Sequence, residues 1–370
     1  MTCVKLAIVL IALGLLAACA PMLQSAGRPE AGFAGPRLDG ADFVSFDGAR
    51  LGLTRWDAKG SDGGAVEPWA VIVGLHGMND YANAFHMAAP WWATQGVTTL
   101  AYDQRGFGRS PRRGIWAPDA LTTEDLRTIV ALARRQWPRA EIVVAGESLG
   151  GAVAIEAFAS ARPPAADRLV LLSPAVWGWS SQPLTYRALL WLAARSAPGK
   201  VFTPPSWLTR RISPSDNRAE LIAMGADPLM IWGARSDALY GLVTTMQRAQ
   251  NGVTALRVPT LYLYGAHDEI IPRAAALTAV RRLPPTARTA WYRDGWHLLM
   301  RDEEGLLVWR DVLAFVRDPT VPLPSGAPAI PGARTLRSAR TERGAGCDAG
   351  AGGVRGRSFC ASSAVREPSP

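Results

Sequence analysis

The stretch IVVAGESLGG, residues 142–151, joins a short apolar run of strand-forming residues to an alanine-rich apolar stretch with the composition of a helix. Between the two lies the pattern Gly146-x-Ser148-x-Gly150. In the order strand, tight turn, helix, this pattern exposes a serine hydroxyl above the end of a sheet. The amide of Leu149, at the start of the helix, would face the same space and favour a developing oxyanion. We therefore expect Ser148 to be a nucleophile; the alternative is a chance Gly-Ser-Gly turn, which is common in loops.

The composition indicates a globular protein with a substantial core. The chain has 370 residues, of which 48% are hydrophobic and 19% are charged, enough for one large or two small domains. Its net charge of +9 comes mostly from scattered arginines, without a basic run longer than short pairs. This pattern is typical of a GC-rich genome and does not predict nucleic-acid binding. A weak attraction to anionic lipid stays open.

The first residues have the features of a secretory signal: an early lysine, an apolar run over 6–16, and the sequence LAAC at 16–19. The run is too short to span a bilayer comfortably. Small residues before a cysteine resemble the bacterial lipobox, which implies cleavage before Cys19 and a lipid anchor on it. We favour this interpretation over an ordinary secretory signal. Ala20 instead of aspartate follows the cysteine, so the resemblance implies a lipid-anchored protein of the cell envelope, on the periplasmic side of the outer membrane.

Two compositionally biased segments flank the expected domain. Residues 1–18 are expected to be the lipoprotein signal peptide. Residues 19–40, which are rich in Gly, Ala and Pro, predict a flexible tether. Residues 320–370 are dominated by Gly, Ala, Ser, Pro and Arg and predict a disordered tail. The globular domain is therefore expected over 41–319. No disulfide framework is expected in its core, because the four cysteines lie outside it: Cys3, Cys19, Cys347 and Cys360.

Apolar strands alternate with helical stretches along the domain. Strands are expected at 42–46, 51–56, 70–75, 97–102, 142–145, 168–172, 260–264 and 289–292. The alternation predicts an α/β fold with a mostly parallel central sheet flanked by helices. It breaks over 174–258, a segment helical in pattern, which predicts a helical cap inserted after the sixth strand, over the carboxyl ends of the strands. Its tryptophans either line a substrate channel or pack the cap onto the sheet: Trp177, Trp179, Trp191, Trp207 and Trp232.

A serine hydroxyl needs a base within hydrogen-bond reach and a carboxylate that orients that base. His297 follows the last expected strand, and Asp268 follows the strand before it. Together with Ser148, they lie beyond carboxyl ends of strands, at one edge of the sheet. The chain order Ser, Asp, His is the order found with this serine pattern. His267 is the competing base and Glu269 the competing third member.

These residues resemble the α/β-hydrolase superfamily and, within it, the monoacylglycerol lipase and lysophospholipase group, which is similar to serine aminopeptidases. The resemblance runs from about 42 to 316. Its carriers are HGM at 76–78, DQRGFGRS at 103–110, GESLGG at 146–151, GAHD at 265–268 and GWH at 295–297. It implies that Ser148 is the nucleophile, His297 the general base and acid, and Asp268 the orienting carboxylate. It also implies that the amides of Met78 and Leu149 form the oxyanion hole.

The sequence departs from the pattern of this group near the serine and in the loop after His76. The group often has a glycine and then an acidic residue or histidine in that loop, where this chain has Asn79 and Asp80. We expect these two to cap the following helix, since Asn and Asp favour that position, with head-group binding as the alternative. Glu147 stands where the group often carries a histidine. His76 is expected to hold the oxyanion loop, and His86 to be a packing or surface residue.

The sequence thus predicts a carboxylic ester hydrolase that uses an acyl-enzyme, and the resemblance implies monoacylglycerol or lysophospholipid as substrate. No cofactor is expected, and no metal either, since no metal-ligand spacing occurs. Partners would be the lipid substrate and a membrane, without nucleic acid, and the oligomeric state stays open. An aminopeptidase or acyltransferase is the alternative on the same fold. From another class, the alternative is a non-catalytic binding lipoprotein.

Overall fold

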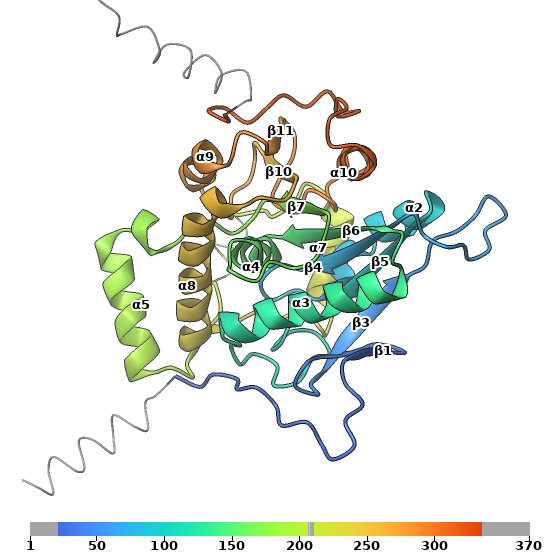
Figure 1. Ribbon diagram of the computed structural model, residues 1–370. Coiled ribbons are helices and arrows are strands. Elements are labelled where there is room, and N and C mark those ends of the chain that lie inside the picture. The colour runs from blue at the N-terminus through green and yellow to red at the C-terminus, as the bar shows by residue number, and fades with distance from the viewer. Residues whose placement is uncertain (1–20, 206, 208–210, 335–370) are drawn as a thin grey trace, which may run out of the picture. The chain divides into compact units, whose positions relative to one another are not determined.

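The computed structural model of the chain describes residues 21–205, 207 and 211–334. The expected signal peptide, Cys19, Cys347 and Cys360 lie outside these residues, so their roles stay predictions. Figure 1 shows the arrangement of the helices and strands.

A nine-stranded sheet runs through the middle of the domain in the order β1-β2-β3-β5-β4-β6-β7-β10-β11 (Figure 1). The first three strands and the β3–β5 pair are antiparallel, and the six strands from β5 to β11 are parallel. The central strands are continuous apolar runs because helices cover both faces of a parallel sheet. The strands are β1 (Arg37–Asp39), β2 (Asp42–Val44), β3 (Arg50–Trp56), β4 (Ala70–Leu75), β5 (Val97–Tyr102), β6 (Glu141–Glu147), β7 (Arg168–Leu172), β10 (Thr260–Gly265) and β11 (Arg288–Tyr292).

Helices cover both faces of the sheet. One face carries α3, α4, α8 and α9, and the other carries η1, α2 and α10. The bounds are η1 (Ala82–Phe85), α2 (Ala88–Thr94), α3 (Asp119–Gln136), α4 (Leu149–Phe158), α8 (Ser236–Gly252), η3 (Val253–Ala255), α9 (Arg273–Arg282) and α10 (Gly305–Arg317). The expected α/β architecture is therefore confirmed. Within the described part of the chain, no helix is long and apolar enough to cross a membrane.

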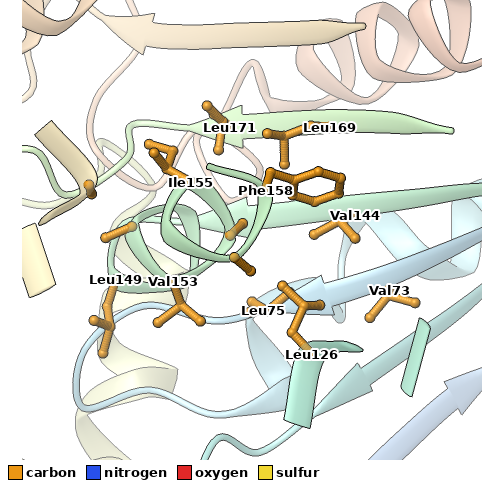
Figure 2. Close-up of a cluster of buried hydrophobic side chains, with 14 of the residues drawn as sticks. Val73, Leu75, Leu126, Val144, Leu149, Val153, Ile155, Phe158, Leu169 and Leu171 are labelled. Carbon is orange, nitrogen blue, oxygen red and sulfur yellow. The ribbon is translucent and has the colours of Figure 1, made fainter. Parts of the chain in front are cut away.

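Helix α4 is the element that joins the two layers at the serine. Nine of its ten residues are buried, because it lies between the sheet and α8. Figure 2 shows Leu149, Val153 and Phe158 of this helix among side chains of the neighbouring strands, such as Val144 and Leu169. A helix that is apolar on all sides belongs to such a buried layer. Its start is thus fixed relative to the ends of the strands.

The inserted segment between β7 and β10 differs from the prediction in two respects. It follows the seventh strand, because β1 precedes the six strands that the sequence predicts, and α8 packs on α4 as a flanking helix of the sheet. We therefore restrict the term cap to residues 174–235. The cap also contains a small antiparallel pair of strands. Its elements are η2 (Trp179–Ser181), α5 (Leu184–Ser196), β8 (Val201–Phe202), α7 (Arg218–Ala226) and β9 (Ala234–Arg235).

The domain extends beyond both predicted boundaries. The segment 21–40, expected as a free tether, contacts the domain: Gln24 is buried, and its backbone N–H donates to the carbonyl of Trp116 at 2.9 Å. Residues 320–334, expected as part of a disordered tail, also pack on it. Ile330 is buried there and donates its N–H to Thr289 Oγ1 at 2.9 Å. Composition predicted both boundaries wrongly because a few buried apolar side chains can order a Gly- and Pro-rich segment.

Replacement of Ile330 by alanine tests this packing. Because the side chain is only 1% exposed, Ile330→Ala should lower the free energy of unfolding by about 2–5 kcal/mol. Urea denaturation measures the change. Val321→Ala, in the same segment but at an exposed position, should change stability by less than about 0.5 kcal/mol. Equal effects of the two variants would show that the segment does not pack as described.

Candidate active site

Ser148 occupies a strained turn between β6 and α4. Its backbone angles are φ 50° and ψ −114°, a conformation that residues other than glycine rarely adopt. Backbone hydrogen bonds to the neighbouring chain hold the turn: its N–H donates to the carbonyl of Leu172 at 3.0 Å, and its carbonyl accepts from the N–H of Ala175 at 2.9 Å. Such strain persists where the surroundings fix the conformation, and it is common at functional residues.

The turn requires glycine on both sides of the serine. A Cβ atom at Gly146 would lie 2.6 Å from backbone atoms of Gly150. A Cβ atom at Gly150 would lie 2.3 Å from the carbonyl oxygen of Leu75 in β4. Both distances are far below van der Waals contact. Only glycine therefore fits at these two positions.

Asp268 and His297 meet at the carboxyl ends of β10 and β11. His297 Nδ1 lies 2.9 Å from Asp268 Oδ2. The other carboxylate oxygen, Oδ1, accepts the N–H groups of Ile270 and Ile271 at 2.9 and 2.8 Å. A carboxylate only accepts, so Nδ1 carries the proton of the neutral ring and Nε2 is left as the acceptor. The aspartate thereby fixes both the tautomer and the orientation of the ring.

The electrostatic surroundings favour the protonated form of His297. Burial disfavours the imidazolium, but the negative charge of Asp268 and its hydrogen bond outweigh burial, so the pKa of His297 lies above its usual value of 6.5. The charge of Glu147 acts in the same direction, and the charge of Arg301 opposes it. The ring is neutral, and able to accept a proton, only above this raised pKa.

The loop after β4 lies beside the serine and is held by His76. A Cβ atom at Gly77 would lie 3.3 Å from Cβ of Ser148. His76 Nε2 accepts the N–H of Gln104 at 2.8 Å, so Nδ1 carries the proton and donates to the carbonyl of Gly77 at 2.7 Å. The Gln104 side chain in turn donates to the carbonyl of His76 at 2.8 Å. The predicted role of His76 in holding this loop is consistent with these contacts.

The amides expected to form the oxyanion hole belong to this loop and to the start of α4. Among the described residues, none accepts a hydrogen bond from the N–H of Met78 or of Leu149. Leu149 is the first residue of α4, where the N–H has no partner within the helix and the helix dipole is positive. Both donors are thus available for a ligand.

The competing candidates lie elsewhere. The ring of His267 stacks on Trp296, with centroids 5.3 Å apart. The carboxylate of Glu269 accepts the N–H of Ser213, in the cap, at 2.8 Å. Neither contacts the Asp268–His297 pair in the way a base or an orienting acid would. His86 bridges η1 and the cap, with Nε2 at 3.4 Å from Glu220.

The capping role expected of Asp80 is wrong. The residue that caps η1 is Tyr81, without a side-chain hydrogen bond. The Asp80 side chain instead accepts from the guanidinium of Arg301 at 2.7 Å. Sequence analysis missed Arg301 altogether, although a lone arginine after the apolar residues 298–300 was a signal that could have found it. Asn79 lies in the left-handed region with φ 65°, and its carbonyl accepts the N–H of Ile231 in the cap at 3.0 Å.

A cavity of about 360 Å³ opens beside the oxyanion loop. Its lining is mostly apolar and includes Met78, Phe107, Trp116 and Ile231. None of the five cap tryptophans lines this cavity; Trp177 and Trp179 pack against the core, while the others are exposed. A larger cavity of about 550 Å³ lies between β11, α10 and residues 325–328, and none of Ser148, Asp268 and His297 lines it.

A family model described as serine aminopeptidase S33 matches residues 66–304. The chain belongs to this family. The match covers the sheet from β4 onward, the cap and the loop that carries His297. The matched range also includes the turn of Ser148 and the Asp268–His297 pair.

Curated relatives and solved structures agree with this assignment. The monoacylglycerol lipase of Mycolicibacterium smegmatis is 29% identical over 74% of this chain and 95% of its own length. The monoglyceride lipase of Rattus norvegicus is 25% identical over 72% of this chain and 86% of its own. A soluble variant of Saccharomyces cerevisiae monoglyceride lipase superposes with a TM-score of 0.63 at 17% identity, over 80% of this chain and all of that chain, which shows the α/β-hydrolase fold. The S33 family member is thus a carboxylic ester hydrolase.

Removal of the Asp268 charge should change the titration of His297. Asp268→Asn takes away the carboxylate that stabilises the imidazolium, so the pKa of His297 should fall. NMR of histidine-labelled protein measures this pKa, since the chain has only four histidines to assign. Glu269→Gln, at the neighbouring position, serves as the matched control and should leave the titration unchanged. A larger change in the control would make Glu269 the partner of the histidine.

Proposed function

We propose that the protein is a serine hydrolase that releases the fatty acid from monoacylglycerol or lysophospholipid through a Ser148, His297 and Asp268 triad. The observation that carries the proposal is the Asp268–His297 hydrogen bond of 2.9 Å. It leaves Nε2 of the ring as the acceptor at the edge of the sheet where Ser148 is presented. An orienting carboxylate, a neutral imidazole and a serine on a strained turn are the parts that acyl transfer needs.

The steps follow from these positions. Ser148 Oγ attacks the acyl carbonyl carbon while its proton passes to Nε2 of His297, and the electron pair of the C=O bond moves to the oxygen. The amides of Met78 and Leu149 bind this oxyanion. Collapse of the intermediate breaks the ester bond, and the leaving alcohol takes the proton from His297. Water then attacks the acyl-enzyme, with His297 as base, and the fatty acid leaves as Ser148 regains its proton.

Charge near the oxyanion loop favours an ester substrate over a peptide with a free amino terminus. The cavity beside Met78 is lined by Arg113 and Arg235 and by no acidic residue. A free α-amino group would be held by a carboxylate, whereas an apolar cavity suits an acyl chain. The aminopeptidase alternative therefore has no support from this cavity.

The outer surface of the cap supports a lipid substrate. Helix α5 exposes Leu184, Leu189 and Trp191, and Leu184 is 74% exposed. Figure 1 shows α5 on the outer side of α8. No aspartate or glutamate occurs between Asp167 and Asp216, while Arg187, Arg195 and Lys200 are present. An apolar surface whose own segment of chain carries only basic charges fits an anionic lipid interface. The lipid anchor proposed at Cys19 would keep the protein at the same interface.

Ester hydrolysis by the Ser148→Ala variant tests the proposal directly. Turnover of p-nitrophenyl esters should fall by about four to six orders of magnitude, because the remaining oxyanion donors accelerate the reaction only weakly without the nucleophile. Ser173→Ala is the matched control, since Ser173 also has a positive φ beside a strand end; it should retain turnover. A decanoyl or longer optimum would support a lipid substrate, and an acetyl optimum would contradict it. Inactivity of the wild type on all esters, with ligand binding intact, would favour a binding lipoprotein.

Vesicle binding tests the cap surface. In protein that carries Cys19→Ser and so lacks the proposed anchor, Leu184→Asp with Leu189→Asp should abolish cosedimentation with phosphatidylglycerol vesicles, while hydrolysis of a soluble short-chain ester stays within about twofold. Binding by the Cys19→Ser protein should weaken as salt is added, because the basic side chains contribute. Val66→Asp changes an exposed valine on the loop between β3 and β4, outside the cap, and should leave binding intact. Equal losses in both variants would exclude the cap as the specific contact.

A further inference from the structure

A buried ion cluster lies behind the serine, centred on Arg301. The Arg301 side chain is 1% exposed. Its Nη2 donates to Asp80 Oδ2 at 2.7 Å and to Glu147 Oε1 at 2.8 Å. Its Nη1 lies 3.9 Å from Glu220 Oε1 and 3.7 Å from the sulfur of Met224. One guanidinium thus faces three carboxylates.

These carboxylates belong to different segments of the site. Asp80 is two residues after Met78 in the oxyanion loop, and Glu147 immediately precedes Ser148. Arg301 itself follows His297 by four residues, while Glu220 belongs to α7 of the cap. A single side chain therefore connects the oxyanion loop, the nucleophile turn, the loop of His297 and the cap.

Backbone contacts reinforce the connection between the cap and the loop of His297. The N–H of Leu298 donates to the carbonyl of Pro214 at 2.9 Å. The Asn217 side chain donates to the carbonyl of Arg301 at 3.0 Å. Asp302 accepts from the hydroxyl of Ser215 at 2.7 Å and from the N–H of Trp296, also at 2.7 Å. The residue before His297 is thus tied to a cap serine through one carboxylate.

Burial of four charged groups is costly, and a buried ion pair seldom adds net stability compared with apolar residues of the same size. Stability alone therefore does not explain why this position holds an arginine. Geometry near the serine offers an explanation: Glu147 Oε1 and Ser148 Oγ lie 3.6 and 3.9 Å from the same point, the site of a Cβ atom at Gly77. The cluster is adjacent to the reacting atoms without contacting the substrate cavity.

We propose that Arg301 is a positioning residue: the ion cluster that it forms with Asp80, Glu147 and Glu220 holds the oxyanion loop, the nucleophile turn and the His297 loop in their catalytic arrangement against the cap. The inference rests on the proposed function, since it assigns a role at the same site. The cluster also links that site to the cap, because helix α7 supplies one of its members. Displacement of α7 would loosen the loops that carry the oxyanion donor and the base.

The charges that act on the His297 ring come from several elements. Asp268 follows β10, Glu147 ends β6, and Arg301 lies in the ring's own loop. Asp302 accepts the N–H of Trp296, the residue before His297, and burial raises the pKa of the Asp302 carboxyl group to about 7. Asp268 and Glu147 raise the pKa of His297, and Arg301 lowers it. The titration of His297 therefore reports on the cluster independently of catalysis.

Two variants of the full-length chain test the proposal. Glu147→Gln keeps an acceptor for Arg301 but removes a negative charge, so the pKa of His297, followed by NMR, should fall. Arg301→Lys keeps the charge but loses the planar fork that binds two carboxylates. It should lower kcat for a soluble p-nitrophenyl ester by about 100-fold while KM stays within about twofold, because the loops shift and the cavity does not. In Glu147→Gln, the acid limb of the pH profile of kcat/KM should shift to lower pH together with the pKa of His297.

Asp125→Asn is the matched control. Asp125 is a buried carboxylate in α3 that binds a different buried guanidinium, Arg105, at 2.7 Å. Its loss should lower Tm as much as Glu147→Gln does, but should leave both the His297 titration and kcat unchanged. A structural role for the Arg301 cluster would make the two variants alike.

The outcomes separate this inference from the proposed function. The inference is overturned if the pKa of His297 is no lower in Glu147→Gln than in Asp125→Asn. It is also overturned if Arg301→Lys folds and keeps the kcat of the wild type. If Arg301→Lys does not fold, the Glu147→Gln titration decides. If the wild type hydrolyses no ester, the proposed function fails, while a lowered His297 pKa in Glu147→Gln still supports the link between the cluster and the histidine.

Discussion

The approach of α4 to β4 is the constraint on which the site depends. At Gly150 the backbone of the helix lies so close to the carbonyl of Leu75 that no side chain fits between them. This contact fixes the start of α4 against the sheet, and the turn before it is forced into the positive φ of Ser148. The buried apolar surface of α4 stabilises the contact, so packing far from the serine maintains the strain at the serine.

Local patterns in the sequence were enough to predict most of the sheet and the contact between Asp268 and His297. Strands buried on both faces are continuous apolar runs, and β4, β5 and β7 have the predicted bounds. The position of Asp268 and His297 followed from their place after strands, because parallel strands bring their carboxyl ends to one edge. The prediction needed no knowledge of side-chain contacts.

Features that depend on contacts between distant segments were not predictable in this way. The carboxylates that face Arg301 are 81 to 221 residues away in sequence, from Glu220 to Asp80. The local sequence draws attention to the arginine but does not identify its partners. The same holds for Ile330 and Gln24, whose segments have the composition of linkers but are ordered by burial against the domain. Composition describes what a segment can do alone, and tertiary contacts decide what it does in the fold.

The two sides of the cap differ in polarity. Its contacts with the catalytic loops are largely polar: Tyr81 donates to Asp227 at 2.6 Å, and Arg113 donates to the carbonyls of Pro228 and Met230 at 2.7 and 2.8 Å. Its outer surface, in contrast, is apolar. Water can replace the polar contacts on the inner side of the cap at a small net cost in free energy. It cannot replace the contact between lipid and the leucine and tryptophan side chains on the outer side. A lipid surface would therefore act on the outside of the cap while the inside remained free to rearrange.

The N-terminal segment limits the distance between Cys19 and the cavity beside the oxyanion loop. The N–H of Met22 donates to Asp237 at 3.1 Å, and Asp237 pairs with Arg235, which lines the cavity beside the oxyanion loop. Cys19 lies three positions before Met22, a chain length of about 10 Å when extended. With the proposed acyl anchor on Cys19, this short segment would hold the entrance of the cavity close to the membrane surface. Such an enzyme would search for substrate in two dimensions, along the membrane, and would scarcely encounter esters dissolved in the surrounding water.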